Sequence, residues 1–204
     1  MLARIWGCRG SPATPGADTV RYGGNTSCVE VRLESGHLMI LDAGTGIRPL
    51  GAELDDEPIE ELHLFLTHLH LDHLQELGFF RPLCRPGMKV HIRGPASPVH
   101  SLADRIAIYV SPPLFAVRLA DVDADITFHD APGEAVTIGS ATVRAANVAH
   151  QGPTVGYRIE ENGTTLAYLP DHEPSLGVVL ADQPPTWISG PISFGSPARG
   201  RNAG

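Results

Sequence analysis

The stretch that decides the fold is Thr67-His68-Leu69-His70-Leu71-Asp72-His73. It brings three imidazoles and one carboxylate together between an apolar run at 61–67, which predicts a buried strand, and a segment at 72–80, which predicts a helix. Imidazole and carboxylate groups suit zinc and similar first-row divalent ions, and the chain has no Cys-x-x-Cys pair for a thiolate zinc site. The competing interpretation is that each histidine is separately satisfied by backbone hydrogen bonds. The crowding at a strand-to-helix turn favours an open catalytic metal site instead.

Short apolar runs punctuated by glycine and proline extend outward from this stretch. The chain holds 22 glycines and 18 prolines, which is typical of many strands and turns. The apolar patterns predict strands at 29–33, 37–41, 61–67, 89–93, 141–148, 156–160 and 164–169. The turns Glu34-Ser35-Gly36 and Glu161-Asn162-Gly163 predict two β-hairpins, and the best helical patterns are at 72–80 and 98–109. Strand pairs with interspersed helices predict an α+β, layered α/β fold.

Length and composition predict one globular domain. The 204 residues, 42% of them hydrophobic, suffice for a core that buries roughly 70% of the surface of the unfolded chain. We expect the domain to cover 1–189 and the Gly-, Pro-, Ser- and Arg-rich segment 190–204 to be an unstructured tail. The three cysteines are too scattered for a disulfide framework, no apolar run reaches the ~18 residues of a membrane span, and the first residues lack a signal-peptide core. These features predict a cytoplasmic protein with no membrane partner.

The charge balance limits the partners that we expect. With 15 Lys and Arg against 23 Asp and Glu, the net charge is −8, which argues against a long nucleic acid as partner. The segment 79–118 is a local exception, with one acid against six basic residues, namely Arg81, Arg85, Lys89, Arg93, Arg105 and Arg118. Either this segment attracts a small anionic substrate or it is a solvated basic face.

The stretch 67–73 resembles the His-x-His-x-Asp-His motif of the metallo-β-lactamase superfamily, and the flanking sequence extends the resemblance. Gly7-Cys8-Arg9-Gly10-Ser11 and Tyr22-Gly23-Gly24-Asn25-Thr26-Ser27 resemble the branch of cyclic-phosphate phosphodiesterases and tRNA 3′-processing ribonucleases. Leu41-Asp42-Ala43-Gly44-Thr45-Gly46 is similar to the first superfamily motif, Val148-Ala149-His150 to the third and Leu169-Pro170-Asp171-His172 to the fourth. The resemblance covers about residues 4–175 and implies an αββα sandwich that is incomplete at its C-terminus.

The resemblance also implies a ligand set for two metal ions. It assigns His68, His70 and His150 to one ion and Asp72 and His73 to the other, with Asp171 between them. We expect Zn²⁺, with Mn²⁺ or Fe²⁺ as alternatives, because all three accept such ligands. Two divalent ions ~3.5–4 Å apart can share a water, lower its pKa toward ~7 and present hydroxide to an electrophile.

Further residues near these motifs are candidates for supporting roles. Asp42 either fixes a loop or an imidazole through a hydrogen bond, or is only a turn-forming residue before glycine. Asp72 and His172 are the candidate catalytic residues, and His172 is alternatively a surface side chain. The histidines away from the motifs are expected not to be ligands, namely His37, His63, His91, His100 and His129.

The expected function is metal-dependent hydrolysis, with small or cyclic phosphodiesters as substrates. One alternative is an acyl hydrolase acting on a lactone, thioester or β-lactam, because the same hydroxide attacks carbonyl carbons. The other is a catalytically impaired metal-binding protein. The branch supplies a late histidine to the second metal, and this chain has no histidine after His172. A frameshifted or truncated chain, or completion of the site by water or by a second copy in a homo-oligomer, would account for this, and we expect the second ion to bind more weakly.

Overall fold

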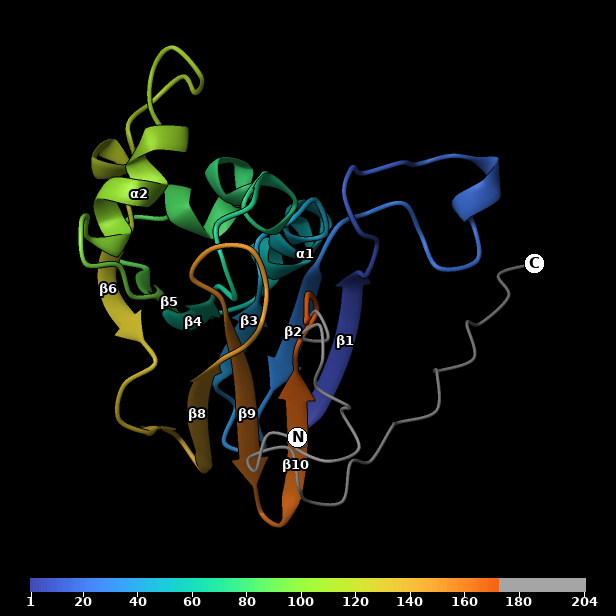
Figure 1. Ribbon diagram of the computed structural model, residues 1–204, viewed down its shortest axis with the longest axis vertical. Coiled ribbons are helices and arrows are strands. Elements are labelled where there is room, and N and C mark those ends of the chain that lie inside the picture. The colour runs from blue at the N-terminus through green and yellow to red at the C-terminus, as the bar shows by residue number, and fades with distance from the viewer. Residues whose placement is uncertain (173–204) are drawn as a thin grey trace.

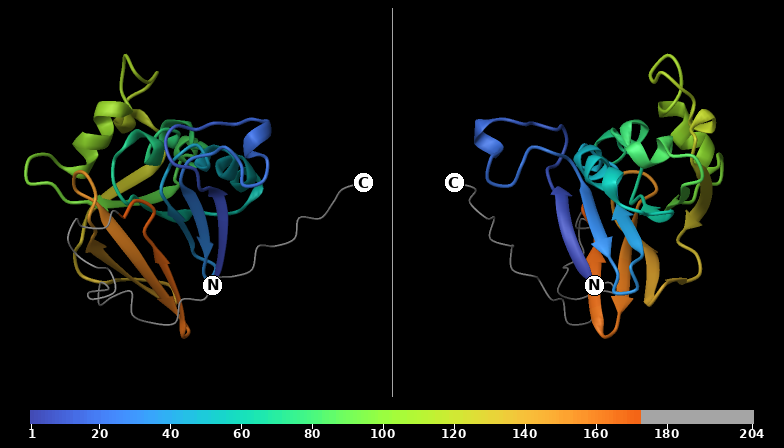
Figure 2. Two further views of the ribbon diagram at one scale, coloured as in Figure 1. Left: turned by 45° about the vertical axis from the view of Figure 1, so that its right-hand side comes forward. Right: turned by 180° about the vertical axis from the view of Figure 1, so that it is seen from behind.

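Two β-sheets stacked face to face form the body of the molecule, and helices cover the outer face of the larger one (Figures 1 and 2). The structure is a computed structural model and describes residues 1–172. The larger sheet has the order β1-β2-β3-β4-β5-β6, with bounds Leu2–Gly7, Cys28–Arg32, Leu38–Leu41, Glu61–Phe65, Lys89–Pro95 and Asp125–Ala131. The smaller sheet has the order β10-β9-β8-β7, and its strands in chain order are Val136–Ile138, Ala141–Asn147, Val155–Glu161 and Thr164–Tyr168.

The described helices are short. Two are α-helices, α1 (Ile47–Glu53) and α2 (Leu102–Tyr109). The remaining turns are 3-10 helices, η1 to η6, with bounds Ala17–Thr19, Leu54–Asp56, Leu71–His73, Leu77–Phe79, Arg81–Cys84 and Leu119–Asp121. No helix in the described part of the chain is long and apolar enough to cross a lipid bilayer.

Alternation along the strands divides the interior into two apolar cores. In β4, Leu62 and Leu64 point to the core under the helices, whereas Phe65 points to the core between the sheets. Ile47 and Leu50 of α1 close the first core. The second core has no helical residue among its members, because the smaller sheet covers that face. The predicted layered α/β fold is therefore confirmed.

Both predicted hairpins are confirmed, because their turns suit tight reversals. β2 and β3 pair antiparallel around the turn that contains Gly36, whose φ is +85°. β9 and β10 pair antiparallel with Thr164 opposite Glu161, and Asn162 and Gly163 between them have φ values of +47° and +79°. Positive φ at both central positions is the reason that Asn-Gly favours such turns.

The predicted helix at 72–80 is wrong. The segment instead forms η3 and η4, separated by the turn residues 74–76. The cause is competition for backbone hydrogen bonds: the His73 carbonyl accepts from Ala43 N at 2.8 Å, and Glu76 N donates to the Ala43 carbonyl at 3.3 Å. These bonds to the loop at Ala43 replace the i to i+4 bonds that an α-helix needs.

Other element boundaries also differ from the expectations. α2 begins at Leu102 rather than at Pro98, because Ser101 is its N-cap and accepts a hydrogen bond from Asp104 N. Strands β1, β6 and β7 and helix α1 were not predicted; α1 carries Pro49 and Gly51, which weaken a helical pattern. The expected domain end at 189 and the tail at 190–204 lie outside the described residues.

Candidate metal centre

The six predicted ligands come together beyond the carboxyl-terminal ends of the central strands of the larger sheet. The stretch 67–73 follows β4 at the carboxyl ends of the parallel strands, where βα connections commonly place functional groups. His150 comes from the connection between β8 and β9, and Asp171 follows β10 (Figure 1). Tertiary packing thus joins segments that are about 80 residues apart in the sequence.

Three imidazole nitrogens form the first part of the centre. His68 Nε2 lies 3.0 Å from His70 Nδ1, which lies 3.3 Å from His150 Nε2. The rings of His68 and His70 meet edge to face at a centroid distance of 4.4 Å. Ring nitrogens at this separation leave space between them for a shared cation.

The Asp171 carboxylate connects this trio to a second group. Its Oδ2 is 3.6 Å from His68 Nε2, 3.7 Å from His150 Nε2 and 3.3 Å from His73 Nε2. Asp72 lies at the margin, with its Oδ2 3.5 Å from His73 Nε2. The Asp171 carboxylate therefore lies within reach of both groups of predicted ligands.

The donor set fits a transition-metal cation. Ligand bonds of 2.0–2.2 Å in tetrahedral geometry place neighbouring ligand atoms about 3.4 Å apart. The six separations above range from 3.0 to 3.7 Å. Neutral imidazole and carboxylate ligands of this kind suit zinc and similar ions.

Asp42 orients two of the imidazoles from behind. It is fully buried, and its carboxylate accepts hydrogen bonds from His73 Nδ1 at 2.8 Å and Thr67 N at 2.7 Å. Thr67 Oγ1 lies 3.0 Å from Asp42 Oδ1 and 3.1 Å from His68 Nδ1. If each Nδ1 carries its proton toward this network, the Nε2 lone pairs of His68 and His73 face the centre.

Of the two sequence interpretations of Asp42, its contacts favour the hydrogen bond to an imidazole. Its φ is +62°, a conformation that aspartate tolerates better than most residues, at the point where the chain leaves β3. Tyr168 OH also donates to Asp42 Oδ2, at 3.0 Å, and sequence reasoning missed this contact. The available signal was the position of Tyr168 in the strand that precedes Asp171.

The electrostatics of the centre favour neutral imidazole at His68. Burial lowers the pKa of His68, and repulsion from the positive charges of His73, His70 and His150 adds to this effect, so that the pKa is about 3. At His73, burial lowers the pKa, but the hydrogen bond to Asp42 and nearby carboxylates outweigh burial and raise it overall. The His68 imidazole is therefore neutral at neutral pH, the form that a metal ligand requires.

His172 is half-buried, not a fully exposed surface side chain. Both of its ring nitrogens are shielded from solvent and have no hydrogen-bond partner within residues 1–172. A buried imidazole without partners is costly unless it serves a ligand or substrate. It directly follows Asp171 in the chain.

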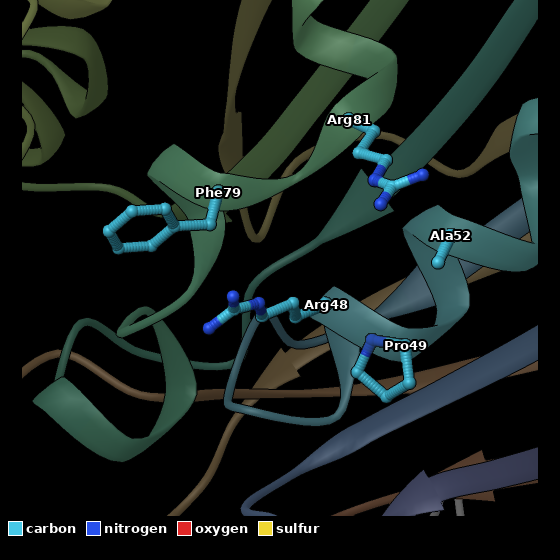
Figure 3. A pocket seen from close by; sticks show the side chains of 5 residues that line it. All are labelled: Arg48, Pro49, Ala52, Phe79 and Arg81. Atoms are coloured by element: carbon cyan, nitrogen blue, oxygen red, sulfur yellow. The ribbon is translucent and has the colours of Figure 1, made fainter.

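A separate hollow lies between α1 and η4, away from the six ligands. Figure 3 shows the side chains that line it, namely Arg48, Pro49, Ala52, Phe79 and Arg81. The Arg48 guanidinium lies 5.8 Å from the centre of the Phe79 ring, and Arg81 is paired with Asp55. The hollow contains none of the predicted ligands.

The basic segment 79–118 is largely engaged within the molecule. Arg81 and Arg85 pair with Asp55, and Arg118 pairs with Asp121. The other two arginines are also in contact: Arg105 donates to the Pro95 carbonyl, and Arg93 lies over the Phe65 ring. These contacts favour a structural role for most of the charges.

Comparisons with known proteins agree with this architecture. Residues 37–180 match a family model described as a beta-lactamase superfamily domain. The uncharacterized protein Rv1339 of Mycobacterium tuberculosis is 30% identical over 177 residues, which cover 82% of this chain. The chain spans 58% of the length of that relative.

Two solved structures show the same fold. A diphosphatase from the PhnP family superposes with a TM-score of 0.56 at 20% identity, covering 77% of this chain and 61% of that one. The Zn²⁺-bound PqqB of Methylobacterium extorquens superposes with a TM-score of 0.55 at 23% identity, covering 82% of this chain and 62% of that one.

Proposed function

Because this chain belongs to the beta-lactamase superfamily, we propose that it is a metal-dependent hydrolase whose substrates are small or cyclic phosphodiesters. The observation that carries the proposal is the position of Asp171 Oδ2, within 3.7 Å of ring nitrogens of His68, His150 and His73. A carboxylate shared by two ligand groups is the arrangement that a two-metal centre needs. The fold shared with a diphosphatase supports phosphorus as the electrophile.

The residues would divide the work as follows. His68, His70 and His150 would hold one cation, and Asp72 and His73 the other, with Asp171 serving both. When bound, two divalent cations would lower the pKa of a water and stabilise charge on the leaving oxygen. Zinc suits the imidazole-rich donor set, and the fold is shared with a zinc-bound protein.

The surrounding residues would hold the ligands in place and move a proton. Asp42 and Thr67 fix the rings of His73 and His68 through their Nδ1 atoms. His172, next to Asp171, is the candidate donor of a proton from a ring nitrogen to the leaving oxygen. A small substrate bearing a phosphate would bring the negative charge that complements the cations.

The test combines metal stoichiometry with hydrolysis of bis(p-nitrophenyl) phosphate, with and without chelator. We expect turnover that the chelator abolishes, and a loss in Asp171→Ala of at least about a hundredfold, the upper end of what changes to residues that only orient ligands cost. Asp18→Asn, an exposed aspartate far from the centre in sequence, is the matched control. Full turnover of metal-free protein would overturn the proposal.

Substrate comparison separates the phosphodiesterase from an acyl hydrolase on the same fold. Rates on a cyclic nucleotide are to be measured beside rates on a lactone, a thioester and a β-lactam. We expect the phosphodiester to be preferred. Preference for an acyl substrate would retain the metal centre but overturn the assignment of substrate, and bound metal without turnover on any substrate would indicate a metal-binding protein.

A further inference from the structure

A second group of imidazoles and a carboxylate lies on the larger sheet, far from the centre described above. Glu61 and His63 are on β4, and His91 is the direct Cα partner of His63 on β5. All three share the face of Phe65, which is turned toward the smaller sheet. His63 precedes His68 by five residues, so the two groups are on the order of 15 Å apart along the strand direction.

The three ligand atoms converge. Glu61 Oε1 lies 3.1 Å from His91 Nε2 and 3.3 Å from His63 Nε2. The two rings stack with their centroids 4.8 Å apart and their planes at 17°, and both Nε2 atoms face the same Glu61 oxygen. These separations match the spacing of about 3.4 Å between neighbouring ligands of a tetrahedral cation.

Burial and access suit a bound cation. The His63 side chain is 9% exposed, whereas those of His91 and Glu61 are 26% and 43% exposed, so the group opens to solvent on one side. His129 on β6 adds another imidazole, with its ring centroid 5.7 Å from that of His91. Its Nε2 is buried and has no hydrogen-bond partner within residues 1–172.

We propose that Glu61, His63 and His91 form a second cation site, which takes a divalent transition metal such as Zn²⁺ and is independent of the hydrolytic centre. Two imidazoles and one carboxylate are three protein ligands, and solvent completes the coordination. The sequence indicated that these histidines are not ligands, because both lie away from the motifs and 27 residues separate His63 from His91. Parallel pairing of β4 with β5 brings them together.

Arg93 limits the affinity of this site. Its Nη1 lies 3.3 Å from His63 Nδ1, and a guanidinium can only donate there. The proton of neutral His63 then resides on Nε2 and points at Glu61. Cation binding requires that proton to move to Nδ1 and the contact with Arg93 to break, so Arg93 opposes binding through both its hydrogen bond and its charge.

The experiment is a Zn²⁺ titration of the chelator-stripped full chain by calorimetry, comparing the natural chain with Glu61→Gln. This variant is isosteric and half-exposed, so it retains the fold, which circular dichroism checks. We expect Glu61→Gln to bind one Zn²⁺ ion fewer per chain, or to bind the ion at this site with an affinity at least about tenfold lower. The rate of hydrolysis should be unchanged. Arg93→Met, which retains the packing on Phe65, should tighten the same site by about tenfold.

Histidine ring NMR locates the ion directly. On adding Zn²⁺, the Nε2 signals of His63 and His91 should shift, and those of exposed His100 should stay in place. Equal stoichiometry and affinity in the natural chain and Glu61→Gln, with unshifted His63 and His91 signals, would overturn the site. Because the readouts are binding and ring signals, failure here is distinguishable from failure of the proposed hydrolysis.

Discussion

At the scale of single residues, Asp42 shows how one buried carboxylate orients the side chains around it. It accepts hydrogen bonds from the backbone and side chain of Thr67, from His73 and from Tyr168. A buried charge is tolerated only when such donors surround it. The same donors include the ring that must turn its Nε2 toward the metal centre.

Asp42→Asn should weaken both the fold and the centre. An amide retains one oxygen but places N–H groups against the donors from His73 and Tyr168, so we expect the free energy of unfolding to fall by about 1–3 kcal/mol. Cation affinity should fall about 10–100-fold, as for other residues that orient ligands. Urea denaturation of stripped protein and Zn²⁺ titration measure the two effects. Unchanged values would show that Asp42 does not orient His73.

His63 should make stability depend on pH. Burial, and then the positive charges of His91 and Arg93, lower its pKa from 6.5 to about 4. Between these values the unfolded chain binds a proton that the folded chain does not, so the free energy of unfolding falls as pH falls through this window. The contribution is at most about 3 kcal/mol.

The measurement is urea unfolding of metal-stripped protein at pH 7 and pH 4. His63→Gln removes the titration and should lose less stability between the two pH values than the natural chain does. His100→Ala, which alters an exposed imidazole, is the control and should lose as much as the natural chain. Equal losses in all three proteins would contradict the assignment to His63.

At the scale of elements, close backbone contacts hold the loop before α1 against the motif. A Cβ on Gly44 would lie 2.3 Å from the Asp72 carbonyl oxygen and 2.4 Å from Thr26 Oγ1. Only glycine allows the loop to approach the ligand segment so closely. The bond from Ala43 N to the His73 carbonyl continues the same contact.

Gly44→Ala should therefore disturb the stretch 67–73 through direct backbone contact. We expect the free energy of unfolding to fall by about 1–3 kcal/mol, since backbone atoms must move to admit the methyl group. Cation affinity should fall with it, because Asp72 and His73 move. Gly10→Ala, where nothing lies within 4 Å of the added carbon, is the control and should change neither. Thermal unfolding and Zn²⁺ titration decide between these outcomes.

At the scale of the whole molecule, the contact between the two sheets assembles the candidate metal centre. The smaller sheet holds the strand end of the motif at two points: Tyr157 OH donates to the Leu66 carbonyl at 2.7 Å, and Val155 N donates to the Thr67 carbonyl at 2.9 Å. His150 lies in the connection between β8 and β9 of the same sheet, and Asp171 follows β10. Packing of the sheets therefore brings both halves of the ligand set together.

Tyr157→Phe tests whether packing of the smaller sheet supports the candidate metal centre. The ring remains against Phe65, but the buried Leu66 carbonyl loses its donor, so the free energy of unfolding should fall by about 1–3 kcal/mol. Cation affinity should decrease as well, because Leu66 directly precedes the ligand segment. Tyr22→Phe, at a side chain 71% exposed, is the control. A loss of stability without any change in cation affinity would show that this contact between the sheets does not support cation binding.

The sequence by itself determined the features that depend on short range. Four of the six predicted ligands lie within six residues, and Asn-Gly defines a hairpin. Such patterns predict structure because turns and pleats have fixed local geometry. The family motifs added His150 and Asp171, whose proximity to the stretch 67–73 the structure shows.

Only the tertiary structure decided the features that depend on contacts between residues distant in the sequence. The segment 72–80 has the periodicity of a helix, yet bonds from Ala43 divide it into 3-10 turns. Tyr168 reaches Asp42 across the two sheets, and His63 meets His91 through the register of parallel strands. The physical reason is that strand register and sheet packing are set by the burial of whole faces, which no local pattern of residues specifies.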